Sequence, residues 1–292
     1  MLPDTVANAI HMYLEQHISP GDWRFQLPHY GNSVDKCFFA TSSSQTVVVR
    51  LGIDPLIVAQ LAEAQITPRY LGGGVTSQGQ PFFVQAFVHA HHPDEHWYCA
   101  NLSQLAPLIA ALQRLTSLRT RLPPVVDESY QSLFARYLSE IHQEYTQVAR
   151  AHADKQRMGV MIRDMEVRVA QVQGAGLVPC HGDLNSGNIL VTHDATYLSD
   201  WETLHLSDPV RDVAHLLWWM YPPSRWAPMF HHFAINVVDE NVKERFYLHV
   251  AMRALYIYLL FVNTAQEQLA RRFLDDADRA MTYRTPATLL IR

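Results

Sequence analysis

Hydrophobic and polar positions recur with two different spacings along the chain, and the spacing changes between residues 85 and 100. Before the change, short apolar runs separated by polar turns predict strands. These are residues 35–41 and 46–51, which the turn SSSQ joins as a hairpin, and residues 81–88. Two stretches with helical spacing, residues 1–20 and 55–64, accompany the strands. The N-terminal part is therefore predicted to be rich in β-structure.

After residue 100, apolar side chains recur with a period near 3.6, which predicts helices. The stretches that share this spacing are residues 102–118, 129–153, 158–172, 208–220 and 241–272. A short segment with a strand-like pattern, residues 177–200, interrupts these predicted helices. Strands first and helices afterwards predict an α+β fold with segregated lobes. We expect a β-rich N-terminal lobe over residues 1–88 and a mainly helical C-terminal lobe over residues 89–292.

The composition excludes several classes of protein. The 292 residues are 48% hydrophobic with a net charge of only -5, which excludes a disordered chain. The 23 basic residues form no stripe, which argues against a nucleic-acid partner. Three cysteines without a CxxC pair predict neither disulfides nor a thiolate zinc site, and they favour the reducing cytoplasm. The most apolar run, residues 254–262, is too short to span a membrane, so we expect a buried helix and no membrane partner.

The most informative chemistry lies between residues 180 and 214, where three polar clusters follow one another. The first is CHGDLNSGN, in which Asp183 is followed five positions later by Asn188. The second is SDWE with Asp200, and the third is DPVRD with Asp212. Phosphoryl transfer needs a group that orients a hydroxyl, and hard oxygen ligands for Mg²⁺. A loop with Asp183 and Asn188, followed by a hairpin that brings Asp200 back to this loop, offers one base and two metal ligands.

This segment resembles the aminoglycoside phosphotransferase and choline kinase superfamily, whose members have a protein-kinase-like fold. HGDLNSGNIL matches the family's catalytic loop, H-x-D-x-x-x-x-N, and DWE followed by DPVRDVA matches its metal-binding and following segments. The resemblance implies that Asp183 is the catalytic base and that Asn188 and Asp200 bind Mg²⁺. It also implies that His181, in the same catalytic loop, supports this loop together with Asp212.

A weaker resemblance extends the match to residues 28–90. It places Arg50, near the end of VVVRL, against the nucleotide phosphates, and it lets Gln85 to Phe87 present backbone groups to adenine. The family glutamate that pairs with the strand cation has no clear counterpart in this sequence. Glu63 is the nearest candidate, and Asp54 is the alternative.

The Gly-rich phosphate loop of the family is reduced here to Gly31 in HYGNSVDK, with Asn32 or Ser33 as candidates for a backbone cradle. Because this loop departs from the family pattern, two functions stay open. The first is a small-molecule kinase that transfers the γ-phosphoryl group of ATP, or GTP, to a hydroxyl with Mg²⁺. The second is a catalytically inactive, kinase-like nucleotide-binding module. A metal-dependent hydrolase with His181 and Asp183 as ligands is a weaker third hypothesis.

The catalytic loop does not specify the acceptor, since it contacts only a hydroxyl. An aminoglycoside, choline or ethanolamine, thiamine, homoserine and sugars all fit. An amine-bearing acceptor is one alternative, because aromatic side chains suited to cation–π contact follow the metal segment. These are Trp201, Trp218, Trp219, Tyr221 and Trp226. The plainer interpretation is that these rings pack in a helical core.

Overall fold

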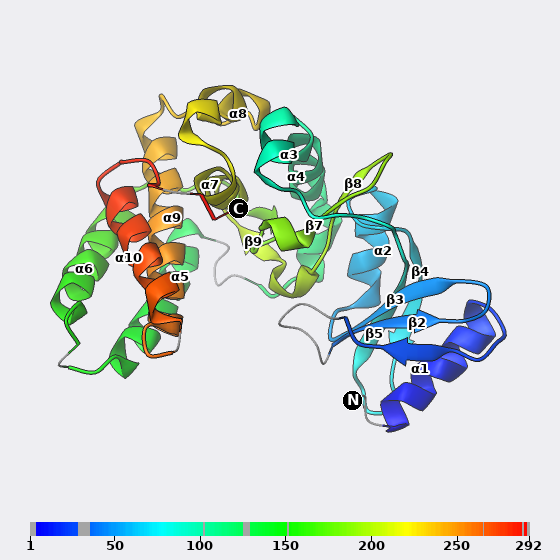
Figure 1. The fold of residues 1–292 in the computed structure, drawn as a ribbon. Helices are drawn as coiled ribbons and strands as arrows, with labels where there is room; N and C mark the ends of the chain where they lie inside the picture. Colours follow the sequence, from blue (N-terminus) through cyan, green and yellow to red (C-terminus); the bar gives the residue numbers. More distant parts are fainter. Residues whose placement is uncertain are drawn as a thin grey trace. The chain divides into compact units, whose positions relative to one another are not determined.

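Figure 1 shows the computed structural model of the chain, which describes residues 4–28, 36–101, 103–124, 129–150, 152–264, 266–287 and 289–290. Gly31, Asn32 and Ser33 of the predicted phosphate loop lie outside these residues. The fold consists of two compact units, one made by residues 1–92 with 188–203 and the other by residues 93–187 with 204–292. The segment 188–203 thus packs with the N-terminal unit, and the predicted lobe boundary at residue 88 stays a prediction.

The first unit is built on a five-stranded antiparallel sheet in the order β1-β2-β3-β5-β4. Its strands are β1 (Arg24–Gln26), β2 (Cys37–Thr41), β3 (Thr46–Leu51), β4 (Tyr70–Val75) and β5 (Pro81–Ala86). The other elements are α1 (Asp4–His17), α2 (Pro55–Glu63), the strands β7 (Ile189–Val191) and β8 (Thr196–Leu198), and the 3₁₀ turn η4 (Trp201–Thr203). Thr41 pairs with Thr46, so the hairpin predicted through the turn SSSQ is confirmed.

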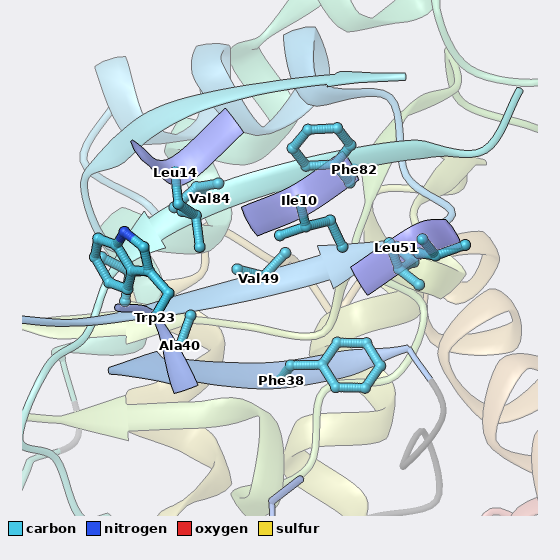
Figure 2. Packing of buried hydrophobic residues seen from close by; sticks show 11 residues of the cluster. Ile10, Leu14, Trp23, Phe38, Ala40, Val49, Leu51, Phe82 and Val84 are labelled. Carbon is cyan, nitrogen blue, oxygen red and sulfur yellow. The ribbon is translucent and has the colours of Figure 1, made fainter. Parts of the chain in front are cut away.

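The apolar core of this unit lies between α1 and the sheet (Figure 2). Val6, Ile10 and Leu14 recur every fourth residue on α1 and are at most 1% exposed, so they form one buried face of the helix. They meet the buried side chains of β2, β3 and β5, among them Val49 and Phe82. Each fully buried side chain of this kind contributes about 1.5–3 kcal/mol. This stripe therefore holds α1 on the sheet.

Alternation along β3 decides which side chains reach that core. Val47, Val49 and Leu51 are buried, whereas the residues between them, Arg50 included, are only partly buried. Successive side chains of a strand point to opposite faces. Arg50 therefore lies on the face of the sheet that is turned away from α1.

The second unit is mainly helical. Its helices are α3 (Glu95–Ala100), α4 (Leu105–Arg114), α5 (Tyr130–Gln147), α6 (Lys155–Gln171), α7 (Val210–Met220), α8 (Trp226–His232), α9 (Glu240–Phe261) and α10 (Glu267–Met281). Its short elements are the 3₁₀ turns η1 (Thr116–Thr120) and η5 (Pro223–Arg225) and the paired strands β6 (Val178–Cys180) and β9 (His205–Ser207). The 3₁₀ turn η3 (Ser186–Asn188) lies where the chain passes from this unit into the first.

Helix α9 packs against α5, α6, α7 and α10. The single helix predicted for residues 241–272 is wrong, because α9 ends at Phe261 and α10 begins at Glu267. The hydroxyl of Thr264 donates to the carbonyl of Phe261 at 2.8 Å and accepts the N–H of Gln266 at 3.1 Å. These bonds compete with the helical ladder, which is how threonine interrupts a helix.

The apolar run at residues 254–262 lies largely within α9, where Leu255 and Tyr258 are fully buried, so the predicted buried helix is confirmed. Within the described ranges, no helix combines the length and the apolar content that crossing a membrane requires. All three cysteines are free thiols. The cytoplasm as the compartment of this protein stays a prediction.

Candidate active site

Arg50 and Asp200 form an ion pair in the first unit. The Nη2 atom of Arg50 lies 3.0 Å from Oδ1 of Asp200, and the Arg50 side chain is 11% exposed. Cys37 lies opposite Arg50 in the β2–β3 pairing. Burial raises the pKa of the Cys37 thiol although the Arg50 charge opposes this, so Cys37 is a neutral neighbour of the pair. The predicted phosphate cation and one predicted metal ligand are thus adjacent.

The hairpin of β7 and β8 brings Asn188 and Asp200 together. Ile189 pairs with Leu198, and the N–H of Ser199 donates to the carbonyl of Asn188 at 2.9 Å. Asn188 is buried, and the Asp200 side chain is 32% exposed. Asp200 has a φ of 65°, in the left-handed region that Asp and Asn tolerate better than most residues. The two predicted metal ligands therefore lie at the open end of one hairpin.

The side chain of Gln85 has a role that the sequence did not reveal. Its amide donates to the hydroxyl of Thr67 at 3.0 Å and to the carbonyl of Pro68 at 2.8 Å. The indole N–H of Trp201 donates to the same Thr67 hydroxyl at 3.2 Å. These bonds tie β5 to the turn that directly follows Asp200, and so they help to position the Asp200 carboxylate.

Phe87 follows β5, and its ring meets Phe39 of β2 edge-on with the centroids 5.6 Å apart. Both rings belong to the partly exposed side of the sheet. The N–H of Ala86 already donates to the carbonyl of Arg69 at 2.9 Å. The backbone contacts of Gln85 and Phe87 with adenine stay a prediction.

The expected partner of Arg50 needs correction. Glu63 is the last residue of α2 and is exposed, and no ion pair joins it to Arg50 among the described residues. Asp54 accepts the N–H of Leu56 at 2.9 Å as the N-cap of α2. Arg50 forms an ion pair with Asp200 and not with Glu63, because α2 ends with Glu63 in solvent, whereas Asp200, just after the β7–β8 hairpin, lies beside Arg50. This removes the reason for placing Glu63 in the nucleotide site.

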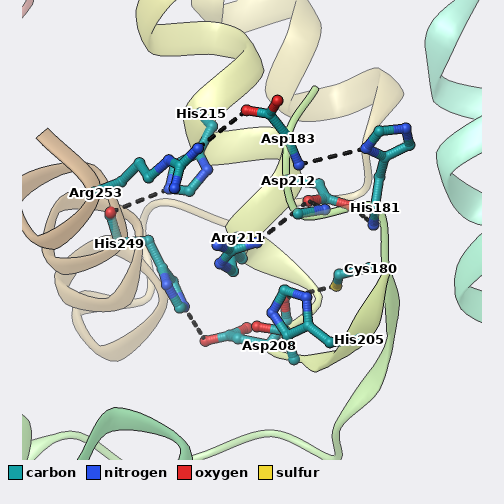
Figure 3. A network of polar contacts seen from close by, with 12 residues as sticks. Cys180, His181, Asp183, His205, Asp208, Arg211, Asp212, His215, His249 and Arg253 are labelled. Carbon is teal, nitrogen blue, oxygen red and sulfur yellow. Dashed lines mark hydrogen bonds and ion pairs between the residues drawn. The ribbon is translucent and has the colours of Figure 1, made fainter. Parts of the chain in front are cut away.

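In the second unit, the catalytic loop begins at His181, directly after β6 (Figure 3). The carboxylate of Asp212 accepts the N–H of His181 at 2.6 Å and the N–H of Gly182 at 3.0 Å. Gly182 has a φ of 87°, a conformation that glycine adopts at little cost. Asp212 is 1% exposed, so its two charge-assisted bonds are shielded from water. The prediction that Asp212 supports the loop is confirmed.

Asp183 is held in place and still faces solvent. Its Oδ1 accepts a bond from Nη2 of Arg253 at 3.1 Å, and its Oδ2 accepts one from Nδ2 of Asn185 at 3.1 Å. Its side chain is nevertheless 40% exposed. His181 is completely buried, and its Nδ1 accepts the N–H of Asp183 at 3.3 Å. In this geometry His181 fixes the backbone of Asp183, and the Asp183 carboxylate is accessible to solvent; the catalytic roles of both residues stay predictions.

Asp208 forms the centre of a second, fully buried network. Its Oδ1 accepts the N–H of Val210 at 2.9 Å and Nη1–H of Arg245 at 3.0 Å, and its Oδ2 accepts Nε2–H of His249 at 3.1 Å. Burial opposes the ionisation of Asp208, but the bond from His249 and the charge of Arg245 hold its pKa below the ordinary value. Burial lowers the pKa of His249, which therefore donates as a neutral ring. Asp208 thus anchors the start of α7 to α9.

The aromatic residues behind the metal segment pack in the interior. Trp218 and Tyr221 are 0% exposed, and Trp219 and Trp226 are 5% exposed. The indole N–H of Trp219 donates to the carboxylate of Asp276 at 3.1 Å. The rings therefore form a helical core, which is the plainer of the two interpretations that the sequence offered.

Sequence reasoning missed Arg253 and gave Arg211 no role. Arg245, His249 and Arg253 recur every fourth residue along α9, which places them on one face of the helix. Polar side chains at this four-residue spacing in the apolar part of the helix are the signal that could have found Arg253. Arg211 lies in the first turn of α7, and its Nη1 is 3.9 Å from Oδ1 of Asp212.

A family model establishes what kind of protein carries this geometry. Residues 56–244, more than half of the chain, match the model described as the phosphotransferase enzyme family. The chain belongs to this family. The predicted superfamily is therefore confirmed, as is the prediction of a phosphotransferase with an alcohol group as acceptor. No curated protein has a sequence that matches this phosphotransferase.

Solved structures share the fold of this phosphotransferase. The choline kinase LicA from Streptococcus pneumoniae has a TM-score of 0.67 at 14% identity, over 95% of this chain and 99% of that chain. Spectinomycin phosphotransferase APH(9)-Ia with ADP and spectinomycin has a TM-score of 0.64 at 14% identity, over 94% and 97%. The GDP complex of aminoglycoside 2'-phosphotransferase-IIIa has a TM-score of 0.64 at 14% identity, over 95% and 99%. This likeness confirms the predicted α+β, protein-kinase-like fold.

Proposed function

We propose that this phosphotransferase transfers the γ-phosphoryl group of ATP, or GTP, to the hydroxyl of a small molecule with Mg²⁺. The observation that carries the proposal is the Asp183 carboxylate, which is fixed at both oxygens, open to solvent, and mounted on a loop that Asp212 holds by two N–H groups. Relatives of similar fold with bound ADP or GDP support a nucleotide as the phosphoryl donor. Family membership favours an enzyme over an inactive nucleotide-binding module.

In the proposed reaction, the hydroxyl oxygen of the acceptor bonds to the γ-phosphorus and its proton moves to the carboxylate of Asp183. The bond between the γ-phosphorus and the bridging oxygen breaks, and that oxygen leaves on the nucleoside diphosphate. Arg253 and Asn185 orient the carboxylate and leave lone pairs for the proton, since each carboxylate oxygen has about two acceptor sites. His181 contributes only by fixing the backbone of Asp183.

Asn188 and Asp200 suit Mg²⁺, which takes hard oxygen ligands and is commonly held by one or two protein groups together with substrate phosphates. The β7–β8 hairpin supplies one amide and one carboxylate at adjacent positions, which fits that requirement. Bound there, Mg²⁺ would neutralise charge on the phosphate oxygens. Arg50, beside Asp200, would bind the phosphates through its guanidinium.

The test measures ADP or GDP release with each nucleotide, with and without Mg²⁺, over a panel of hydroxylated acceptors. Asp183→Asn should lower kcat by about 10²–10⁴-fold, the usual contribution of a general base. Asp200→Asn should abolish the Mg²⁺-dependent rate. Asparagine tolerates the φ of 65° at position 200, so this loss would come from the missing charge.

A matched control is Asp194→Asn, in the turn of the same hairpin, where the aspartate side chain is 88% exposed. Its rate should equal that of the wild type. Unchanged rates in both Asp183→Asn and Asp200→Asn would refute the assignment. A thermal shift with Mg·ATP but no transfer to any acceptor would instead favour the inactive module.

A further inference from the structure

A small pocket in the second unit lies next to the proposed base. Its lining includes Tyr137 and Glu140 of α5, Arg211 of α7, and Arg253 of α9. Arg253 also donates to Asp183 (Figure 3), so a single guanidinium both lines the pocket and contacts the proposed base. The pocket volume is about 50 Å³. At about 10–15 Å³ for one water, this holds roughly three to five small groups, which suits a carboxylate but not a sugar ring.

Arg211, which lines this pocket, carries an unsatisfied donor. Its side chain is 9% exposed, and its buried Nη1 has no hydrogen-bond partner among the described residues. The carboxylate of Asp212 lies 3.9 Å away, too far for a hydrogen bond, and already accepts two backbone N–H groups. The guanidinium carbon also lies over the ring of Tyr137, 5.3 Å from its centroid, but this contact gives Nη1 no hydrogen-bond partner. A buried charged donor left without an acceptor is costly, so this arrangement indicates an acceptor that a ligand brings.

The charge of the pocket favours an anion. Within the lining, Arg211 and Arg253 contribute two positive charges, and Glu140 contributes one negative charge from an exposed position. Arg253 is balanced by its ion pair with Asp183, whereas Asp212 lies 3.9 Å from Arg211 and makes no hydrogen bond with it. His215 and His249, which also line the pocket, carry no charge near neutral pH because burial lowers the pKa of each ring. A cationic acceptor would therefore meet two arginines inside the pocket and one carboxylate only at its exposed side.

We infer that this pocket binds a carboxylate of the acceptor, so that the enzyme phosphorylates hydroxylated carboxylic acids. The inference rests on the proposed function, because it places the acceptor hydroxyl at Asp183. Arg211 donates Nη1–H to the carboxylate, whose planar shape matches the guanidinium, and Arg253 adds a second positive charge on the side of Asp183. An amino group on the acid would find its counter-charge at Glu140.

The first experiment compares matched acceptors in the Mg·ATP assay. The probes are ω-hydroxy acids of increasing chain length, their primary amides, serine and threonine, and as cationic controls choline and kanamycin. The best acid should exceed its own amide by about 10- to 100-fold in kcat/KM, the scale of one charge-assisted hydrogen bond. Arg211→Gln should remove that advantage mainly by raising KM for the acid, so that the acid and its amide become equally good acceptors. Arg225→Gln, at an exposed arginine of η5, is the control and should keep the preference.

A second variant does not depend on a buried position. Glu140 is exposed, so Glu140→Gln should fold normally. It should raise kcat/KM for a simple hydroxy acid, because a repelling charge is gone, and lower it for a hydroxylated α-amino acid. Transfer to choline, kanamycin or the amides without a preference for acids would overturn the inference and leave the proposed function intact. Transfer to no acceptor at all would overturn both.

Discussion

Replacing Asp208 with asparagine should destabilise the second unit strongly, although the two side chains have nearly the same shape. Asp208 is completely buried and accepts bonds from Val210, Arg245 and His249. Asparagine has one acceptor oxygen and turns an NH₂ group toward a donor. Arg245, which is 5% exposed, would then keep its charge without a counter-ion. Removing one partner of a buried ion pair costs about 3–5 kcal/mol.

A loss of this size is a large fraction of the roughly 5–15 kcal/mol by which most folded proteins are stable. Urea unfolding followed by tryptophan fluorescence measures it. Four of the six tryptophans, at positions 97, 218, 219 and 226, lie in the second unit, so the signal reports mainly on the part that Asp208 supports. The control is Glu267→Gln, whose side chain is 51% exposed and pairs with Arg271 on the surface. Exposed pairs contribute about 0–1 kcal/mol.

The pH dependence supplies an independent check with a defined sign. Because the pKa of Asp208 is lowered in the folded protein, its stabilisation is complete above the unfolded pKa near about 4 and is lost as the pH falls through the folded pKa. The difference between wild type and Asp208→Asn should therefore shrink as the pH falls below about 4. The buried ring of His215 destabilises both proteins as the pH falls below about 6.5. Asp208 raises the pKa of His249 through their hydrogen bond, so the difference reports on the Asp208–His249 pair. If Asp208→Asn costs no more than Glu267→Gln at pH 7, the reasoning about this buried charge is refuted.

Three further changes test the positioning of the site. Asp212→Asn should lower kcat with little change in the KM for Mg·ATP, because the two loop bonds lose their charge; a normal kcat in steady-state kinetics would contradict this. Gly182→Ala should cost about 1–3 kcal/mol in urea unfolding, because alanine is strained at a φ of 87°; wild-type stability would show that the loop relaxes freely. Gln85→Leu should cost about 1–3 kcal/mol, because the carbonyl of Pro68 loses its buried donor; an unchanged urea midpoint would argue against the Gln85 network.

The sequence predicted those parts of the site that short chain segments build. An apolar run was enough to place Arg50 near the end of a strand, and the spacing of two apolar runs was enough to predict a hairpin between Asn188 and Asp200. The same reasoning failed for the partner of Arg50, because the length of α2 and the exposure of Glu63 follow from how the helix packs. It gave no indication of the bond from Arg253 to Asp183, which joins residues 70 positions apart.

Two arginines that line the proposed acceptor pocket, Arg211 and Arg253, also lie beside Asp212 and Asp183. A substitution that changes the choice of acceptor can therefore also change the stability of the catalytic loop. Arg253 donates a hydrogen bond to Asp183 and orients its carboxylate, so replacing Arg253 would disturb the proposed base itself. A buried carboxylate such as Asp212 needs hydrogen bonds or a counter-charge. Asp212 keeps two backbone N–H groups even without Arg211, so Arg211 is the cation that can be changed while the loop stays in place. A variant that accepts cationic alcohols should therefore arise by substitution at Arg211 and not at Arg253.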